Sequence, residues 1–163
     1  MDFSTFTRIP PRERSNCFGC GTENKYGLAM KFYTDDVKMY CKISVPDHLG
    51  GWDNIVHGGV ISTMLDEIMS WSAIQLLKRF ILTKSINVNF FRPIKLGDEL
   101  VVVGEIGERI SDREAIMKGR ILDSEGNICA DSSGVFALFS LEAVRKLGIA
   151  TEHSLERMKG IIE

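Results

Sequence analysis

The segment from Gly59 to Arg79 constrains the fold most, because its apolar side chains recur almost all the way round the helix that it predicts. A helix that is apolar on all sides must be buried. Segments rich in β-branched and aromatic residues follow, at 83–92, 99–110, 113–123 and 127–139. Because no further long helical pattern separates them, these strands must pair antiparallel. We therefore expect an α+β fold, in which an antiparallel β-sheet wraps around a central helix.

Upstream of the helix, two alternating segments at 28–34 and 37–45 predict a hairpin that turns at Asp35–Asp36. The loop 46–59 follows, with four glycines and one proline. A loop of that length inside a packed domain is a common position for function.

The chain of 163 residues has the size of one domain. We expect a single domain over 1–163, with a polar lead segment at 1–15. The tail at 141–163 is helical in pattern and broken near Gly148, which predicts a C-terminal helical extension packed on the outside of the sheet.

Charge and hydropathy exclude several classes of protein. The 20 Lys plus Arg residues against 22 Asp plus Glu give a net charge of −2, which offers no basic footprint for nucleic acid. No apolar run is long enough for a membrane span, and the first residues lack the apolar stretch of a secretory signal. We expect a cytoplasmic protein with no nucleic-acid or membrane partner.

Cys17 and Cys20 form a C-x-x-C motif, whereas Cys41 and Cys129 stand alone in predicted strands. A zinc site built on the motif would need further ligands, and no second C-x-x-C or H-x-x-x-H pair is present. With no sign of export, a disulfide framework is not expected either. The sequence therefore predicts reduced thiols that pack in a glycine-rich turn, and no metal.

Asp66 and Glu67 are adjacent carboxylates in the middle of the apolar helix. A buried carboxylate must be paired, neutralised or placed beside a functional cavity. Neighbouring helical positions lie about 100° apart, so one of the two points into any given pocket. We choose Asp66, because it shares a face with the small residues Ser62 and Ser70. Glu67 is the alternative carboxylate, and a structural ion pair or a polar seam at an oligomer interface is the alternative role.

His57-Gly58-Gly59 stands at the start of the helix. Glycines allow close approach to the backbone, and the first helical turn presents unpaired N–H groups at the positive end of the helix dipole. This arrangement is a candidate oxyanion hole for acyl transfer. A loop histidine that hydrogen-bonds the turn is the alternative reading of His57.

Helix geometry separates the two candidate parts of the site. Nine residues from His57 to Asp66 correspond to about 13 Å along the axis and about 180° around it. Both can act on one substrate only if the helix lies beside its twin in another subunit. An enzyme built on these residues is therefore expected to be a homo-oligomer, at least a homodimer.

The motifs HGGVISTMLDE and T-x-S-I-N-V-N-F-F-R-P-I-K-L-G-D, with CFGCGTENKYGL upstream, resemble the hotdog-fold acyl-CoA thioesterases of the phenylacetate-pathway (PaaI) type over about residues 16 to 140. The resemblance implies hydrolysis of an acyl-CoA to free acid and CoA, in dimers or dimers of dimers, with no cofactor or metal. It implies Asp66 as nucleophile or general base, Gly58 N–H as the group that polarises the thioester carbonyl, and His57 as a support for the glycine turn. Thr83 aligns with a hydroxyl that helps to position the attacking water.

Substrate-binding candidates are Asn54 in the preceding loop, Gly59 in the glycine turn and Arg92, a basic residue suited to coenzyme A phosphates. The sequence departs from the family pattern at Gly51, where an Asn or Gln is common. Another class of function fits the same motifs: a non-catalytic acyl-CoA-binding or regulatory hotdog domain. The acyl group and the direct or water-mediated role of Asp66 stay open.

Overall fold

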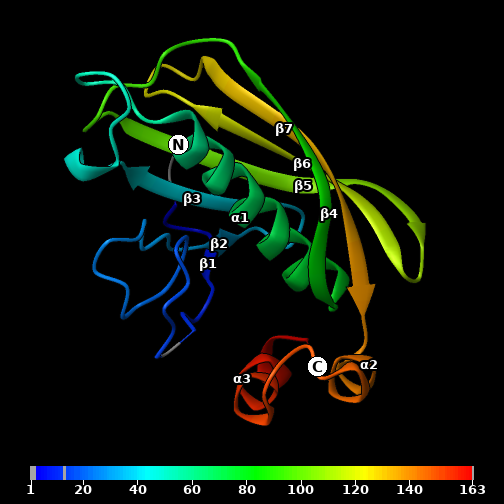
Figure 1. The fold of residues 1–163 in the computed structure, drawn as a ribbon. Helices are drawn as coiled ribbons and strands as arrows, with labels where there is room; N and C mark the ends of the chain where they lie inside the picture. The colour runs from blue at the N-terminus through cyan, green and yellow to red at the C-terminus, as the bar shows by residue number, and fades with distance from the viewer. Residues whose placement is uncertain (1–2, 13, 163) are drawn as a thin grey trace.

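The computed structural model describes residues 3–12 and 14–162, and these form one antiparallel sheet of seven strands that curves round a long helix (Figure 1). The strands are β1 (Thr7–Arg8), β2 (Tyr33–Thr34), β3 (Met39–Ser44), β4 (Phe80–Phe90), β5 (Glu99–Ser111), β6 (Glu114–Leu122) and β7 (Ile128–Phe139). Their order across the sheet is β1-β2-β3-β5-β6-β7-β4, so β4 is an edge strand although it follows the helix directly. The expected α+β hotdog architecture is confirmed.

The long helix α1 (Gly58–Leu77) is the predicted central helix, shifted by one or two residues at each end. Its core face presents side chains with almost no exposed area, such as Met64, Leu65 and Ile68. Gly104 in β5 lets α1 approach the sheet closely, because a Cβ there would lie 2.8 Å from the Ile68 carbonyl oxygen. None of the helices in the described part of the chain combines the length and apolar character needed to cross a membrane.

The four strands predicted after the helix are all present, but the segment 28–34 is a strand only at β2. Its first half bonds to the loop that carries the C-x-x-C motif: Leu28 N–H donates to the Phe18 carbonyl and Met30 N–H to the Gly19 carbonyl. The alternation of residue types predicted a strand, whereas the first half of this segment hydrogen-bonds to an irregular loop. A 3₁₀ turn, η1 (Asp47–Leu49), and the short β1 were not predicted.

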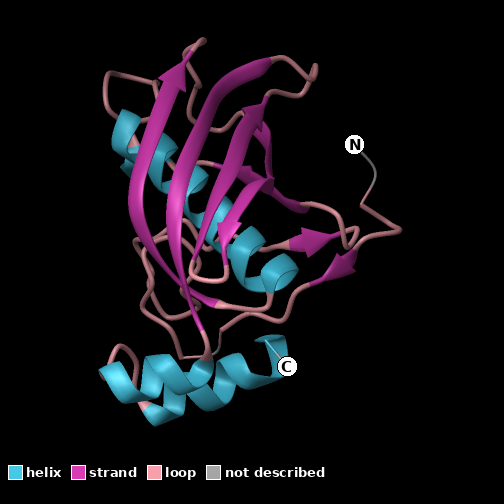
Figure 2. Cartoon of the chain, turned by 90° about the vertical axis from the view of Figure 1, so that its right-hand side faces the viewer, coloured by secondary structure: helices cyan, strands magenta, loops and turns pink. Residues whose placement is uncertain are grey.

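The tail forms α2 (Leu141–Leu147) and α3 (Glu152–Ile162), separated at Gly148 with φ +64°. The expectation that these helices lie on the outside of the sheet is wrong. They lie beyond one end of it (Figure 2), and the Lys78 ammonium after α1 donates to the Ile161 carbonyl at 2.8 Å. Residues 1, 2 and 13 of the expected lead segment and residue 163 of the tail lie outside the described residues.

Candidate active site

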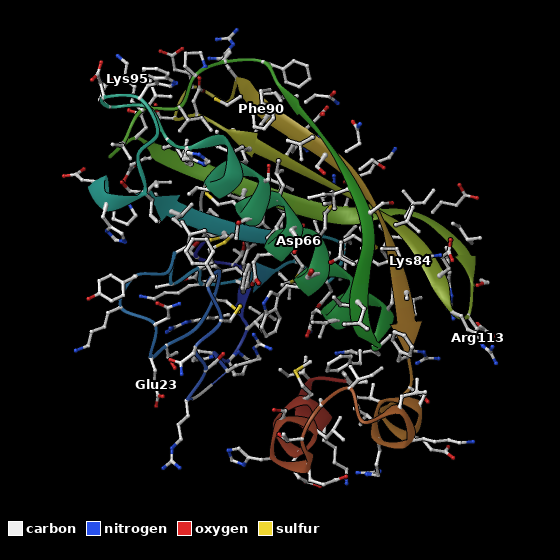
Figure 3. All side chains as sticks on the ribbon, in the orientation of Figure 1. Glu23, Asp66, Lys84, Phe90, Lys95 and Arg113 are labelled. Carbon is white, nitrogen blue, oxygen red and sulfur yellow. The ribbon has the colours of Figure 1, made fainter. Side chains whose placement is uncertain are left out.

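Asp66 lies midway along α1, on the side of the helix next to the edge strand β4 (Figure 3). The Thr83 hydroxyl of β4 donates a hydrogen bond to Asp66 Oδ1 at 2.9 Å. Burial raises the pKa of Asp66 above its usual range, and the hydrogen bond from Thr83 partly offsets that effect. One carboxylate oxygen is thus fixed by Thr83. The sequence analysis named both residues as candidates, and the structure brings them within hydrogen-bond distance.

A β-bulge between Thr83 and Ser85 interrupts the pairing of β4 with β7. Such an extra residue changes which side chains of a strand face the helix. The bulge immediately follows the residue that contacts Asp66. It is a feature of the site that alternation of residue types in the sequence could not locate.

Glu67, the alternative carboxylate, lies against the N-terminal loop and not against Thr83. A hydrogen bond joins Glu67 Oε1 and Cys17 Sγ, which are 3.2 Å apart. Burial raises the pKa of Glu67 to about 7, and the neighbouring Cys17 adds to that shift. The two adjacent carboxylates therefore have separate surroundings, as the 100° step of a helix requires.

The Cys17 thiol has a strongly altered acidity. A hydrogen bond from the Cys20 side chain, helped by the backbone N–H groups of Cys20 and Gly19, lowers the pKa of Cys17 to about 4. The same hydrogen bond and burial raise the pKa of Cys20 above its usual range. Cys17, Cys20 and Glu67 are also the described residues that bring three possible metal-ligand atoms together. Sequence analysis missed Glu67 as a neighbour of this motif, because 50 residues separate it from Cys17.

His57 caps the N-terminus of α1. Its Nδ1 accepts a hydrogen bond from Gly59 N–H at 2.9 Å. The Gly59 N–H is therefore occupied, whereas the Gly58 N–H has no acceptor within the described residues. The free N–H at the positive end of the helix is available to an oxygen that develops negative charge.

Phe90 lies beside this end of the helix, with its ring 3.8 Å from where a Cβ on Gly58 would be. Phe90 is 55% exposed. It lies at the end of β4 that is far from the C-terminal helices (Figure 3). Trp71, by contrast, is buried and stacks on Phe32 at a centroid distance of 5.1 Å. Phe90 therefore adds an exposed apolar surface next to the free N–H, and Trp71 belongs to the core.

The remaining substrate-binding candidates, Asn54 and Arg92, lie near the Gly58 end of α1 and not near Asp66. The Asn54 carbonyl accepts from Leu96 N–H at 2.8 Å, and its side chain is in an exposed turn. Arg92 follows β4, where its N–H bonds to the Cys129 carbonyl and its charge contributes to lowering the pKa of Asp123. Neither side chain contacts Asp66 or Thr83 in the chain as described.

Gly58 N–H and Asp66 lie about 12 Å apart along the helix, because eight residues separate them. Within one chain they cannot contact the same carbonyl group. Thr83, Phe90, His57 and Gly58 are all exposed, so both parts open onto a surface of the single chain. The arrangement offers an activated carboxylate at one point of α1 and an anion-binding N–H at another.

Comparison with known proteins shows which family part of this chain resembles. Residues 53–130 match the sequence model of the family described as "Thioesterase superfamily". This stretch holds α1, β4, Asp66, Thr83 and the glycine turn. This part of the chain is similar to the thioesterase superfamily, and the sheet and helix around it have the hotdog fold.

Acyl-coenzyme A thioesterase THEM5 of Mus musculus is 29% identical over 119 residues, which cover 72% of this chain and 47% of that protein. The matched region is thus about half the length of that relative. Among solved structures, the E. coli PaaI protein from the phenylacetic acid degradation operon has a TM-score of 0.62 at 14% identity, covering 69% of this chain and 81% of that one. PaaI is one of many structural neighbours.

Another solved structure, smu.793 of Streptococcus mutans bound to acetyl CoA, has a TM-score of 0.60 at 15% identity and covers 86% of this chain and 93% of that one. At such identities the similarity establishes the fold alone. The activity has to be argued from the site.

Proposed function

We propose that the protein hydrolyses an acyl-CoA thioester to a free acid and coenzyme A. The observation that carries the proposal is the hydrogen bond from Thr83 to Asp66 Oδ1, which fixes a partly buried carboxylate beside an exposed edge strand. The match of residues 53–130 to the thioesterase superfamily and the distant similarity to an acyl-CoA thioesterase support the same reaction. The acetyl CoA bound to a protein of this fold supports coenzyme A as the carrier of the acyl group.

In the proposed mechanism, Asp66 acts as a general base through the oxygen that Thr83 leaves free. It takes a proton from a water molecule, whose oxygen attacks the thioester carbonyl carbon. The negative charge that develops on the carbonyl oxygen is stabilised by Gly58 N–H, held in place by the His57 cap. Collapse of the tetrahedral intermediate breaks the C–S bond, and the coenzyme A thiolate leaves and takes up a proton.

Because Gly58 and Asp66 of one chain are too far apart, the proposed site contains Asp66 and Thr83 of one subunit and Gly58 of another. The edge strand β4 supports a dimer of this kind, since one side of its 11 residues has no partner strand in the described chain. Ile86 and Phe90 on this strand are exposed, as expected of apolar residues that a second subunit would cover. Asn54, Gly59 and Arg92 are proposed to contact the substrate near the glycine end.

The test is thiol release from short, medium, long and aromatic acyl-CoAs, with wild type compared to Asp66→Asn. Loss of a general base predicts a fall in kcat of about 10²–10⁴-fold. The matched control is Asp112→Asn, which changes an exposed carboxylate in the turn after β5 and leaves turnover unaltered. Equal circular dichroism spectra and equal elution volumes establish that the variants are folded and assembled alike.

Full activity in Asp66→Asn would overturn the assignment of the carboxylate, and Glu67→Gln would then be measured in the same assay. Binding of acyl-CoA with no turnover of any substrate by wild type would overturn the enzymatic proposal. That result would favour the non-catalytic acyl-CoA-binding domain instead.

A further inference from the structure

The C-x-x-C motif meets a third ligand group in the folded chain. The Sγ atoms of Cys17 and Cys20 and a carboxylate oxygen of Glu67 all lie within 4.8 Å of one another. Thiolate and carboxylate are both zinc ligands, and adjacent ligand atoms of a tetrahedral zinc ion with one sulfur and one oxygen are roughly 3.5 Å apart. The separation of 3.2 Å between Cys17 Sγ and Glu67 Oε1 is close to that value.

The loop is shaped around the Glu67 carboxylate before any ion binds. A Cβ on Gly19 would lie 2.1 Å from Glu67 Cγ, so only glycine permits this approach. Gly21 N–H donates to the Cys17 carbonyl at 2.9 Å and closes the turn. The bonds from Leu28 and Met30 described above hold the same loop from outside. These contacts fix both cysteines relative to α1.

The site also contains buried polar atoms that no described residue satisfies. Glu67 Oε2 is buried and has no hydrogen-bond partner, and neither has Nε of Arg12. An unsatisfied buried polar atom lowers the stability of the fold, and more so when it is charged. A cation between the cysteines and Glu67 would give Oε2 an interaction that the protein alone does not provide.

The charges of the cluster balance around a divalent ion. Two thiolates and one carboxylate would carry three negative charges at a largely buried position. One divalent cation and the guanidinium of Arg12, whose Nη2 lies 3.6 Å from Cys20 Sγ, neutralise them. Buried charges require such compensation.

From these contacts we propose that Cys17, Cys20 and Glu67 bind one divalent transition-metal ion of the zinc class. Soft thiolate ligands select zinc over magnesium or calcium. The ion links the N-terminal loop to α1 at Glu67, the residue after Asp66. Glu67 is on the side of the helix that faces away from Thr83. The three side chains leave the fourth tetrahedral position to a water molecule. The site is distinct from the proposed reaction centre and does not depend on the thioesterase activity.

The test uses the full chain without an affinity tag, kept reduced, equilibrated with zinc chloride and freed of excess ion by gel filtration. Elemental analysis is expected to find one zinc ion per chain. Replacement by cobalt is expected to give the thiolate charge-transfer absorption and the intense visible bands of a tetrahedral site. These two readouts test the wild-type protein directly and need no variant to fold.

Variants then identify the ligands. Cys17→Ser and Cys20→Ser are expected to lose the cobalt charge-transfer band, and Glu67→Gln to weaken zinc binding by more than the roughly 10–100-fold effect of losing an outer partner of a metal site. Cys129→Ser is the matched thiol control, since that buried cysteine lies in β7 beside Asn127. It is expected to bind zinc like wild type.

Asp66→Asn separates this proposal from the proposed function, because it is expected to lose turnover and retain zinc. Wild-type protein that retains no zinc and shows no cobalt–thiolate absorption would overturn the metal site. Retention of zinc by the double variant Cys17→Ser, Cys20→Ser would overturn it as well. A third contrary result is a Cys17–Cys20 disulfide in protein purified without reductant, with no zinc bound after reduction. That result would overturn the metal site and identify the two cysteines as a redox pair.

Discussion

At the scale of single residues, the hydroxyl of Thr83 decides how Asp66 is held. Thr83→Val removes the hydrogen bond to Asp66 Oδ1 and keeps the shape of the side chain. A hydrogen bond to a charged group contributes roughly 1.5–3 kcal/mol. We therefore expect thiol release to slow by about 10–100-fold in Thr83→Val.

Thr83→Ser keeps the hydroxyl and is expected to retain most of the activity in the same thiol-release assay. Ser85→Ala, an exposed change on the other side of the bulge, is the control with unaltered rate. A valine variant as fast as wild type would show that Thr83 does not position the carboxylate.

Residue patterns in the sequence could single out Asp66 as a candidate but could not predict the surroundings of Glu67. The neighbours of Asp66 on its helix face are small and polar, and spacing along the helix reveals this directly. Glu67 is explained only by Cys17 and Arg12, which come from a loop about 50 residues earlier and have no periodic relation to the helix. Contacts of that kind follow from the tertiary fold.

At the scale of elements, the loop that carries the C-x-x-C motif docks on α1 through Gly19. Gly19→Ala would place a Cβ 2.1 Å from Glu67 Cγ, so the loop or the carboxylate has to move. Overpacking of this kind costs about 1–3 kcal/mol. Urea denaturation is expected to show a free energy of unfolding lower by that amount.

Gly160→Ala is the matched control for Gly19→Ala, because a Cβ at that position of α3 meets nothing within 4 Å. Alanine is favoured over glycine in a helix, so this variant is expected to be as stable as wild type or slightly more stable. An equal free energy of unfolding for Gly19→Ala and wild type would contradict close docking of the loop.

Glu105 on β5 forms two ion pairs, one with Lys38 just before β3 and one with Arg120 on β6. The hydrogen bond from Lys38 lowers the pKa of Glu105 below its usual value. Its ionised form therefore stabilises the fold above the unfolded pKa of roughly 4.3, and this contribution is lost as the pH falls through the folded pKa.

Because these side chains are partly exposed, the loss for Glu105 is at most about 1 kcal/mol. Urea denaturation of wild type and Glu105→Gln between pH 7 and about pH 3 measures it. The difference in unfolding free energy between the two proteins is expected to shrink as the pH falls. A difference that stays constant would show that the ion pairs contribute nothing through the ionisation of Glu105.

The positions of the strands show which features of the fold a sequence pattern can predict. The strands after the helix have regular alternation, and all were predicted. The segment 28–34 also alternates, but Leu28 and Met30 bond to the cysteine loop and leave only Tyr33–Thr34 as strand β2. The alternation in this segment reflects burial of the side chains on one face. It does not reveal whether the backbone pairs with a strand or with a loop.

At the scale of the whole molecule, the distance between Gly58 and Asp66 determines how many chains one site needs. Gly58 is the first residue of α1, a position that accepts proline, and a proline there removes the N–H that the mechanism uses. His57 has extended backbone angles (φ −62°, ψ 136°), which suit a residue before proline. Gly58→Pro is therefore expected to fold and to be inactive, like Asp66→Asn.

Mixing these two inactive variants tests the shared site. In a mixed dimer, one site carries both substitutions, and the other combines intact Asp66 and Thr83 from one chain with intact Gly58 from the other. In an equal mixture about half of the dimers are mixed and one of their two sites is intact, so about a quarter of wild-type activity should return. Native mass spectrometry measures the fraction of mixed dimers. If they form and the mixture stays inactive, the site is not assembled from Asp66 of one chain and Gly58 of another, and the carbonyl must be stabilised by a different group.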